Sequence, residues 1–407
     1  MIERELYMKQ IQPYIGKPFI KVLTGIRRCG KSSILTLLRN KILSLGVHSE
    51  NIVHINFENM DFADVDNAKK LHACVTNLMR NEAMYYLLFD EIQEVDEWER
   101  AINSLVSLPN VDIYITGSNS RLLSSELATY IAGRYVEINV KTLSFREYLL
   151  FRETLTGKAS GDTRGDFKKF IRTGGFPAIN TSDYEYEAAY RIVKDIHASA
   201  LLRDTVQRHG IRNIDLLDRL IKYVFDNLGN TFSGKNVADY FRSQHRKLDA
   251  DTVYNYLNAL ESAFIITRTR RYDIKGREIL KTMEKFYVAD QSLIYAAMGY
   301  KERMISGILE NIVMHELERR GYDVYIGKLD DKEIDFIAER RGEKIYVQVT
   351  YLLGDSTTIN REFAPLAAVR DNYPKYVLSM DDLWNGNIEG IRHMHAADFL
   401  LKEDDGA

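Results

Sequence analysis

Short apolar runs alternate with amphipathic stretches over the first 150 residues of the chain. The runs are rich in β-branched and aromatic residues, which is typical of strands, whereas the stretches between them carry apolar residues three or four positions apart, which predicts helices. The run before Asp90 is apolar throughout, as expected of a parallel strand buried on both faces. The pattern predicts an α/β fold with a doubly wound parallel sheet. The predicted strands are residues 19–24, 51–57, 84–90, 111–116 and 135–140, and residues up to about 15 form a leading helix.

A glycine-containing turn separates the first predicted strand from the helix predicted at residues 33–42. Its sequence, Gly25-Ile-Arg-Arg-Cys-Gly-Lys-Ser32, matches the G-x-x-x-x-G-K-[ST] phosphate loop. Strand, loop and helix in this order aim backbone N–H groups and the positive helix end at a polyphosphate. We therefore predict that the chain binds ATP, with Lys31 on the β- and γ-phosphates and Ser32 on Mg²⁺. The predicted nucleotide-binding residues are Gly25, Arg28, Gly30, Lys31, Ser32 and Ser33.

Two carboxylates, Asp90 and Glu91, follow the third predicted strand. Taken alone, such a pair is most often the start of a loop or a helix cap. Beside a phosphate loop it is typical of a Walker B strand, in which Asp90 holds Mg²⁺ and Glu91 polarises the attacking water. We predict Ser32 and Asp90 as the metal-binding residues.

The fourth predicted strand runs into a polar turn. In the additional-strand class of P-loop ATPases, the equivalent strand lies between the phosphate-loop strand and the Walker B strand. Ser118 or Asn119 would then sense the γ-phosphate, although a capped turn explains either residue equally well. Arg134 would stabilise transition-state charge on its own nucleotide or on that of a neighbouring subunit in a homo-oligomer, and a surface arginine is the alternative. The predicted catalytic residues are Lys31, Glu91, Ser118, Asn119 and Arg134.

Composition limits the class of protein. A chain of 407 residues holds two or three domains. The net charge of −3 excludes a wholly basic nucleic-acid coat but allows local basic patches. Two cysteines exclude a disulfide framework and a structural zinc site. The first residues lack a signal-peptide core and no run approaches about eighteen apolar residues, so we expect a cytoplasmic protein with no membrane partner.

The pattern in the middle of the chain predicts helices followed by a hairpin. We predict three helices and a hairpin within residues 211–295, an order that resembles a winged helix-turn-helix. Its hairpin is rich in basic residues, and arginines that alternate along a strand share one face, which suits duplex phosphates. A lid or a platform for a protein partner is the alternative for such a domain. The candidate DNA-binding residues are Arg268, Arg270, Arg271, Lys275 and Arg277.

The last hundred residues predict a small α/β domain. A helix at residues 306–321 precedes strands at 323–326, 333–338 and 344–350. This order resembles the PD-(D/E)xK nuclease core, which places carboxylates around a divalent ion and uses a lysine to position or activate water. Glu310 and Asp335 match that pattern, whereas Gln348 replaces the second acid and Thr350 stands at the lysine position. We predict a degenerate nuclease site formed by Glu310, Asp335 and Gln348, and we do not expect cleavage.

Five segments together resemble one family, the prokaryotic AAA-type P-loop ATPases with a C-terminal nuclease-like domain. They are related to the archaeal ATPases and the signalling ATPases with numerous domains. The segments are residues 25–33, 87–93, 115–120, 127–135 and 143–148. The resemblance implies an ATPase core at 1–150, a helical lid at 151–210, a winged helix-turn-helix at 211–295 and a degenerate nuclease-like domain at 300–402.

These features predict a slow, Mg²⁺-dependent ATPase whose nucleotide state gates DNA engagement by its C-terminal half. Two alternatives stay open at this point. One is a signalling switch whose appended domains bind a protein partner, and the other is an ATP-regulated nuclease.

Overall fold

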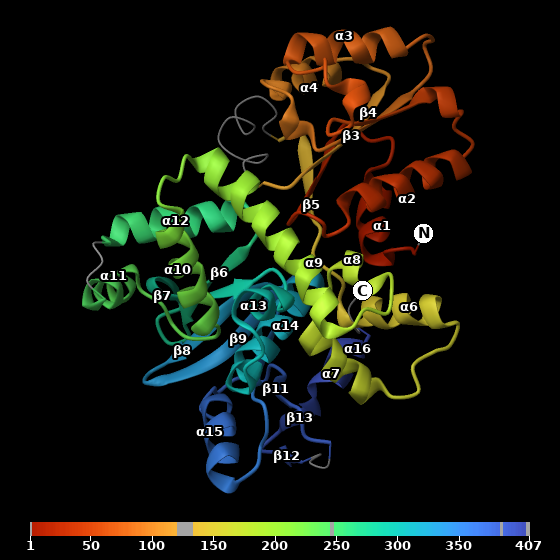
Figure 1. Cartoon of the computed structure of the whole chain (residues 1–407). Coiled ribbons are helices and arrows are strands. Elements are labelled where there is room, and N and C mark those ends of the chain that lie inside the picture. Colours follow the sequence, from red (N-terminus) through yellow and green to blue (C-terminus); the bar gives the residue numbers. More distant parts are fainter. Residues whose placement is uncertain (1, 120–132, 245–247, 383–385, 404–407) are drawn as a thin grey trace. The chain divides into compact units, whose positions relative to one another are not determined.

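A computed structural model of the chain describes residues 2–119, 133–244, 248–382 and 386–403. The chain forms two compact units (Figure 1). The first comprises residues 1–142 with 262–264, and the second comprises residues 143–261 with 265–407. No described helix is both long enough and apolar enough to cross a lipid bilayer.

The first unit is built on a five-stranded sheet in the order β2-β3-β4-β1-β5. Every neighbouring pair is parallel, which confirms the predicted parallel α/β sheet. β4 lies between β1 and β3, as expected for the additional-strand class. The strands are β1 (Ile20–Thr24), β2 (Ile52–Asn56), β3 (Tyr85–Asp90), β4 (Val111–Gly117) and β5 (Tyr135–Asn139).

The helices of this unit follow the predicted alternation, with one difference at the start. The leading helix ends at Ile11 and continues as a short 3₁₀ turn, Gln12–Tyr14, because Pro13 has no N–H to donate to the helix. The α-helices are α1 (Glu5–Ile11), α2 (Lys31–Ser44), α3 (Ala68–Leu78) and α4 (Trp98–Val106), and further 3₁₀ turns are η2 (Ser49–Asn51), η3 (Met60–Phe62) and η4 (Ile92–Glu94).

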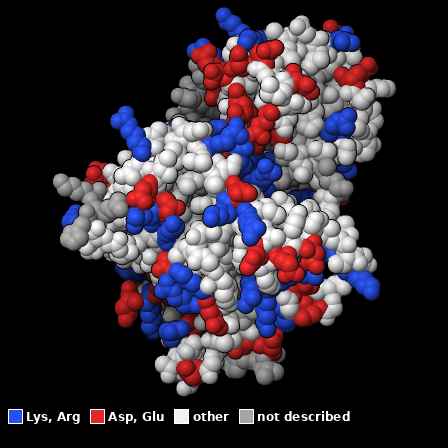
Figure 2. All heavy atoms as spheres, viewed as in Figure 1, with Lys and Arg blue, Asp and Glu red and all other residues white. Residues whose placement is uncertain are grey.

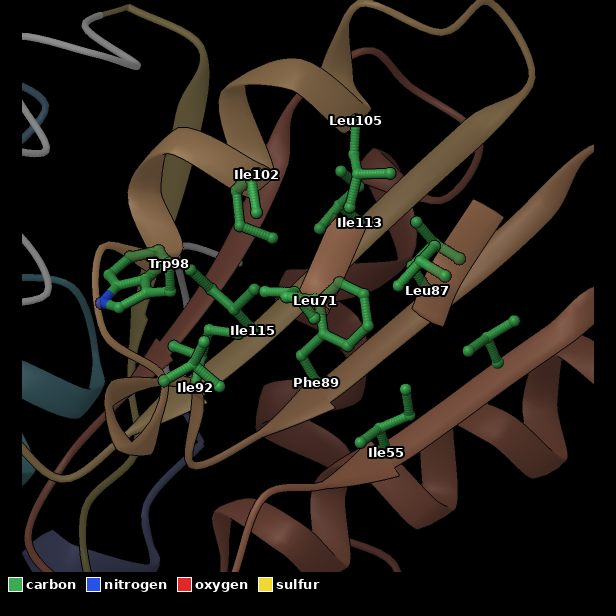
Figure 3. Close-up of a cluster of buried hydrophobic side chains, with 14 of the residues drawn as sticks. Ile55, Leu71, Leu87, Phe89, Ile92, Trp98, Ile102, Leu105, Ile113 and Ile115 are labelled. Carbon is green, nitrogen blue, oxygen red and sulfur yellow. The ribbon is translucent and has the colours of Figure 1, made fainter. Parts of the chain in front are cut away.

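A buried hydrophobic cluster holds the central strands against two helices (Figure 3). Phe89 and Ile115 project from β3 and β4, while Leu71 belongs to α3 and Ile102 to α4. All four side chains are fully buried, and removing apolar surface from water is the main stabilising contribution to such a core. The cluster fixes the ends of β3 and β4, where the polar residues of the candidate site lie.

The second unit begins with helices. The longest helical stretch of the predicted lid is an α-helix, α9, that continues as a π-helical segment, η6 (Ala200–Gln207). The helices are α6 (Phe145–Thr156), α7 (Thr163–Thr173), α8 (Pro177–Asn180), α9 (Tyr186–Ser199), α10 (Ile214–Asp226), α11 (Gly234–Ser243), α12 (Ala250–Ser262), α13 (Ser292–Met298), η7 (Glu302–Met304), α14 (Ile305–Arg319), α15 (Ser356–Ala367) and α16 (Ala396–Leu401).

An eight-stranded sheet completes the second unit, in the order β12-β13-β11-β10-β9-β8-β6-β7. The hairpin β6–β7 is antiparallel, and β6 also pairs in parallel with β8 through Arg271 and Ile326. The basic hairpin therefore belongs to the same sheet as the C-terminal strands. The strands are β6 (Ile266–Asp273), β7 (Glu278–Val288), β8 (Asp323–Leu329), β9 (Lys332–Arg340), β10 (Glu343–Val349), β11 (Lys375–Ser379), β12 (Asn387–Ile388) and β13 (Ile391–His395).

Candidate functional site

The predicted phosphate loop connects β1 to the start of α2. Gly25 and Gly30 both have positive φ, at 142° and 105°. A Cβ at Gly25 would lie 2.1 Å from the carbonyl oxygen of Val140, so only glycine fits there. Cys29 is fully buried, and burial raises the pKa of its thiol, so the loop cysteine is a packing residue rather than a reactive one. Arg28, Ser32 and Ser33 are exposed.

Lys31 lies within this loop. Its ammonium donates to the carbonyl oxygens of Gly25, at 2.9 Å, and Ile26, at 3.3 Å. The same Nζ lies 3.7 Å from Oε1 of Glu91, and the lysine is almost fully buried. Lysine and glutamate, predicted from separate motifs, are therefore neighbours and neutralise one another.

Asp90 is a buried hydrogen-bond acceptor at the end of β3. Its carboxylate accepts from Thr116 Oγ1 at 2.6 Å and from Asn56 Nδ2 at 3.1 Å. Burial raises the pKa of Asp90, while the hydroxyls of Thr116 and Ser32 hydrogen-bond to it and lower the pKa. Ser32 and Asp90, the predicted metal ligands, are thus brought together. Their hydroxyl and carboxylate oxygens are the hard ligands that suit Mg²⁺.

Glu91 adopts a left-handed backbone conformation, with φ of 53°. Its N–H donates to Thr116 Oγ1 at 3.0 Å, and its carboxylate accepts a hydrogen bond from Gln93 Nε2. Thr116 therefore holds both acidic residues, and our sequence analysis missed it. The feature that could have identified Thr116 is its place at the end of the strand between the phosphate-loop strand and the Walker B strand.

The remaining predicted residues of this unit divide into two groups. Ser118 and Asn119 are buried just after β4 and lie at the same sheet edge as Asp90. Arg134 is exposed just before β5, where its carbonyl accepts a hydrogen bond from the N–H of Ile20 at 2.8 Å. Since β1 runs from Ile20 toward the loop, Arg134 lies at the opposite edge of the sheet from its own phosphate loop. Residues 120–132, which include parts of two motifs behind the family resemblance, lie outside the described residues.

The candidate DNA-binding residues of the hairpin have different surroundings. Arg268 donates to Asn258 at 2.6 Å and pairs with Glu261 at 3.2 Å and with Glu284 at 3.3 Å. Lys275 pairs with Asp330 at 2.6 Å. The register of β6 and β7 shifts between Thr269 and Arg271, so the arginines do not form one regular row. Arg270 and Arg277 are exposed, and Arg271 is partly buried.

Acidic residues surround the basic ones on this part of the molecule. A hollow of about 540 Å³ is lined by Arg268 and Arg270 but also by Glu261, Glu318 and Asp323. On the face drawn in Figure 2, acidic and basic side chains are interspersed rather than gathered into a basic surface. This mixture weakens the attraction for a polyanion.

The three predicted nuclease-site residues do come together in the second unit. Asp335 Oδ2 accepts from the N–H of Val349 at 2.8 Å, and Gln348 Oε1 accepts from the N–H of Asp335 at 3.3 Å. Both Asp335 and Glu310 contact the ammonium of Lys285, a residue of β7 that our sequence analysis did not select. Among the residues that the structure describes, no three His, Cys, Asp or Glu side chains are arranged to hold a metal ion.

The lysine position of the nuclease pattern carries no cation, and the lysine of the same strand does not reach the cluster. Thr350 is buried directly after β10. Lys344 points to Glu339, 2.6 Å away, and to the ring of Tyr272 rather than to the carboxylate cluster.

Comparisons with known proteins place this geometry in context. An AAA domain family model matches residues 17–149, and a model described as a domain of unknown function (DUF8612) matches residues 164–303. An uncharacterized protein from Haemophilus influenzae is 36% identical over 403 residues, which is 99% of each chain. Protein MJ1544 of Methanocaldococcus jannaschii, also uncharacterized, is 30% identical over 366 residues, covering 86% of this chain and 79% of its own length.

A solved structure supports the same fold. The Walker-type ATPase PABY2304 of Pyrococcus abyssi superposes with a TM-score of 0.52 at 16% identity, over 73% of this chain and 96% of that one. At this identity the likeness concerns the fold alone. Together with the AAA domain match, it supports the assignment of a P-loop ATPase fold.

Proposed function

Because this chain belongs to the same family as the H. influenzae and M. jannaschii proteins and carries an AAA domain, we propose that it binds ATP with Mg²⁺ and hydrolyses it slowly. The observation that carries this proposal is the convergence of Lys31, Asp90 and Glu91 at one sheet edge, with Thr116 bonded to both acids. These residues lie at the ends of β3 and β4 and directly after the loop that follows β1, and the three strands are neighbours in the sheet.

Each side chain has a defined task in this proposal. Lys31 and the loop N–H groups hold the phosphates, and Ser32 and Asp90 hold Mg²⁺, which when bound neutralises phosphate charge. Glu91 orients and polarises the attacking water. Since Lys31 and Glu91 form an ion pair, phosphate binding to Lys31 would release the Glu91 carboxylate for that task. Ser118 and Asn119 are the proposed γ-phosphate sensors.

Two variants test the ATPase proposal. We expect Lys31→Ala to lose nucleotide binding, measured with a fluorescent ATP analogue, because the cation that contacts phosphate is gone. Glu91→Gln should bind ATP as the wild type does but release phosphate at a rate close to background. Lys41→Ala, an exposed lysine on the same helix, is the matched control. Normal hydrolysis by Glu91→Gln would remove Glu91 from its assigned role.

We further propose that nucleotide state gates DNA engagement by the second unit, in which residues 151–210 act as a lid, 211–295 as a winged helix-turn-helix and 300–402 as a nuclease-like domain. The exposed cations Arg270, Lys275 and Arg277 support this proposal, whereas Arg268 contributes to the hairpin through its acidic partners. Arg271 is partly buried and less accessible to a phosphate.

Fluorescence anisotropy of labelled duplex DNA across a salt series tests the gating proposal. Binding that depends on nucleotide and falls steeply with salt is expected, because cations on the protein release counterions from DNA. Arg270→Ala with Arg277→Ala should weaken binding and reduce the salt slope by about one per lost phosphate contact. Arg219→Ala on α10 is the matched control, since this arginine is also exposed.

A protein partner is the second candidate, and a specific observation favours it. The acids beside Arg268 and Arg270 fit a mixed-charge partner surface better than a uniform polyanion. Absence of DNA binding in every nucleotide state would favour this signalling-switch function. Arg134 lies at the opposite sheet edge from its own phosphate loop, which supports a role at the nucleotide of a neighbouring subunit over a role at its own. In that case the ATPase rate per chain should rise with protein concentration and Arg134→Ala should abolish that rise, whereas a surface arginine would leave the rate unchanged.

A further inference from the structure

Lys285 is the centre of the carboxylate cluster in the second unit. Its Nζ lies 2.9 Å from Glu333 Oε1, 3.3 Å from Glu310 Oε2 and 3.5 Å from Asp335 Oδ1. The three acids come from α14 and β9, whereas the lysine comes from β7. One ammonium thus contacts every carboxylate that the nuclease pattern would assign to a metal ion, and Glu333 as well.

Four residues of the cluster are almost fully buried. Lys285 is 1% exposed, Tyr287 0%, Asp335 6% and Glu310 8%. The Tyr287 hydroxyl donates to Glu310 Oε2 at 3.2 Å. On another side, a Cβ at Gly229 would lie 2.9 Å from Oε1 of Glu310, so the backbone of that turn packs directly on the carboxylate. On the side of Glu333 the cluster borders a hollow of about 380 Å³ that Glu333 and Gln348 help to line, and the Glu333 side chain is 35% exposed.

The electrostatics favour a charged lysine at this position. Burial opposes the ammonium charge, but the surrounding acids and Tyr287 raise the pKa of Lys285 well above its usual value. Burial also raises the pKa of Glu310 to about 8, with Lys285 opposing it, and it raises the pKa of Asp335. The carboxylates are therefore costly to ionise in this environment without a nearby cation.

We propose that Lys285 is the resident cation of this cluster, occupying the place that a divalent metal ion takes among the carboxylates of a nuclease. The ammonium satisfies the same oxygen atoms with one charge, and its four-carbon stem anchors the basic hairpin to α14 and β9. In the wild-type chain the ammonium then takes the place of a metal ion among these carboxylates, and metal-assisted cleavage does not occur there. This inference is independent of ATP hydrolysis, because its residues all belong to the second unit.

The competing interpretation is a catalytic lysine that works beside a bound metal ion. In a working site the lysine positions water next to a metal ion, so lysine and metal must fit together. Here the ammonium contacts the three carboxylates itself and is almost fully buried. The two interpretations make opposite predictions for metal binding by the wild-type chain and by a chain that lacks the lysine.

Mn²⁺ titration followed by electron paramagnetic resonance separates them. The full chain is used without nucleotide and with Asp90→Asn throughout, so that the phosphate-loop region contributes equally to every sample. We expect no Mn²⁺ bound at the cluster in this parent. Lys285→Ala should gain one Mn²⁺ per chain, and adding Asp335→Asn should remove that gain. Lys344→Ala, which deletes the lysine of β10 that lies outside the cluster, should bind no more Mn²⁺ than the parent.

Several outcomes overturn the proposal. One is a Mn²⁺ ion bound by the parent and lost with Asp335→Asn, because lysine and metal then coexist. Another is a folded Lys285→Ala chain with no gain of Mn²⁺. If Lys285→Ala folds only in the presence of Mn²⁺, judged by far-ultraviolet circular dichroism, the metal has replaced the lysine and the proposal stands. Lys285→Gln, which keeps much of the side-chain volume without its charge, is titrated in parallel and must show the same gain.

Discussion

Thr116 is a single residue on which the geometry of both acidic residues depends. Its hydroxyl donates to Asp90 and accepts from the N–H of Glu91, so one side chain fixes the carboxylate assigned to Mg²⁺ and the backbone that carries the carboxylate assigned to water. Removing the Thr116 hydroxyl takes this acceptor away from the buried N–H of Glu91. An unsatisfied buried donor costs about 1–3 kcal/mol.

We predict that Thr116→Val, which keeps the side-chain shape, slows ATP hydrolysis about tenfold or more, since 1.36 kcal/mol corresponds to a factor of about ten in rate. Affinity for ATP should change little, because the phosphate loop is untouched. Phosphate release and nucleotide affinity are measured side by side, and Thr116→Ser is the control that restores the hydroxyl. A fall in affinity with unchanged turnover would contradict this role.

At the scale of residues, the sequence predicts the site residues that belong to short motifs and misses those whose roles depend on contacts with residues distant in the sequence. Lys31, Ser32, Asp90 and Glu91 lie in two short motifs that can be recognised from their neighbouring residues alone. Thr116 and Lys285 gain their roles only from partners 25 or more residues away, and neither has an unusual local sequence. Predicting Lys285 would have required knowing that β6 joins the hairpin to β8.

Secondary-structure elements show the same limit. Each predicted strand of the first unit lies within two residues of the observed one, because short apolar runs define buried parallel strands well. The predicted hairpin also forms, but its sheet partner was not foreseen: β6 pairs with β8, about fifty residues later in the chain. Likewise the residues on β6 were expected to alternate regularly, whereas the register shift after Thr269 breaks that alternation.

The last helix, α16, carries a pH-sensitive cap. His395 Nδ1 accepts a hydrogen bond from the N–H of Ala397 at 3.0 Å, which requires an unprotonated Nδ1. Burial, with Arg164 nearby, lowers the pKa of His395 to about 4, although Asp382 and Asp398 oppose the shift. Since the unfolded histidine titrates near 6.5, the unfolded chain binds more protons between these two values. The stabilising contribution of the cap is therefore complete above pH of about 6.5 and is lost as pH falls toward about 4.

We predict that His395→Asn, whose side-chain oxygen caps the helix at every pH, removes this dependence. Urea unfolding at pH values of about 7 and 5 should show the wild type losing more stability than the variant as the solution is acidified. His48→Asn, a change at an exposed histidine, is the control and should follow the wild type. An equal loss in wild type and His395→Asn would contradict the assignment.

At the scale of the whole molecule, two compact units carry separate chemistry. Residues 1–142 hold the proposed nucleotide site and the second unit holds the Lys285 cluster, so substitutions at Lys31 and at Lys285 fall in different units. Ligand binding stabilises the folded unit that contains the ligand site, by about 2.7 kcal/mol at a ligand concentration one hundred times the Kd. An unfolding transition that a ligand shifts can therefore be assigned to the unit that binds the ligand.

We predict two thermal transitions by differential scanning calorimetry, with MgATP raising only the one that belongs to residues 1–142. Lys31→Ala should remove that rise and leave the other transition unchanged. Lys285→Ala should lower the other transition, because it leaves buried carboxylates without their cation, while the rise with MgATP persists. A single transition that moves with both variants would show that the units unfold together, and any effect of nucleotide on the hairpin would then pass through global stability rather than through a separate conformational step.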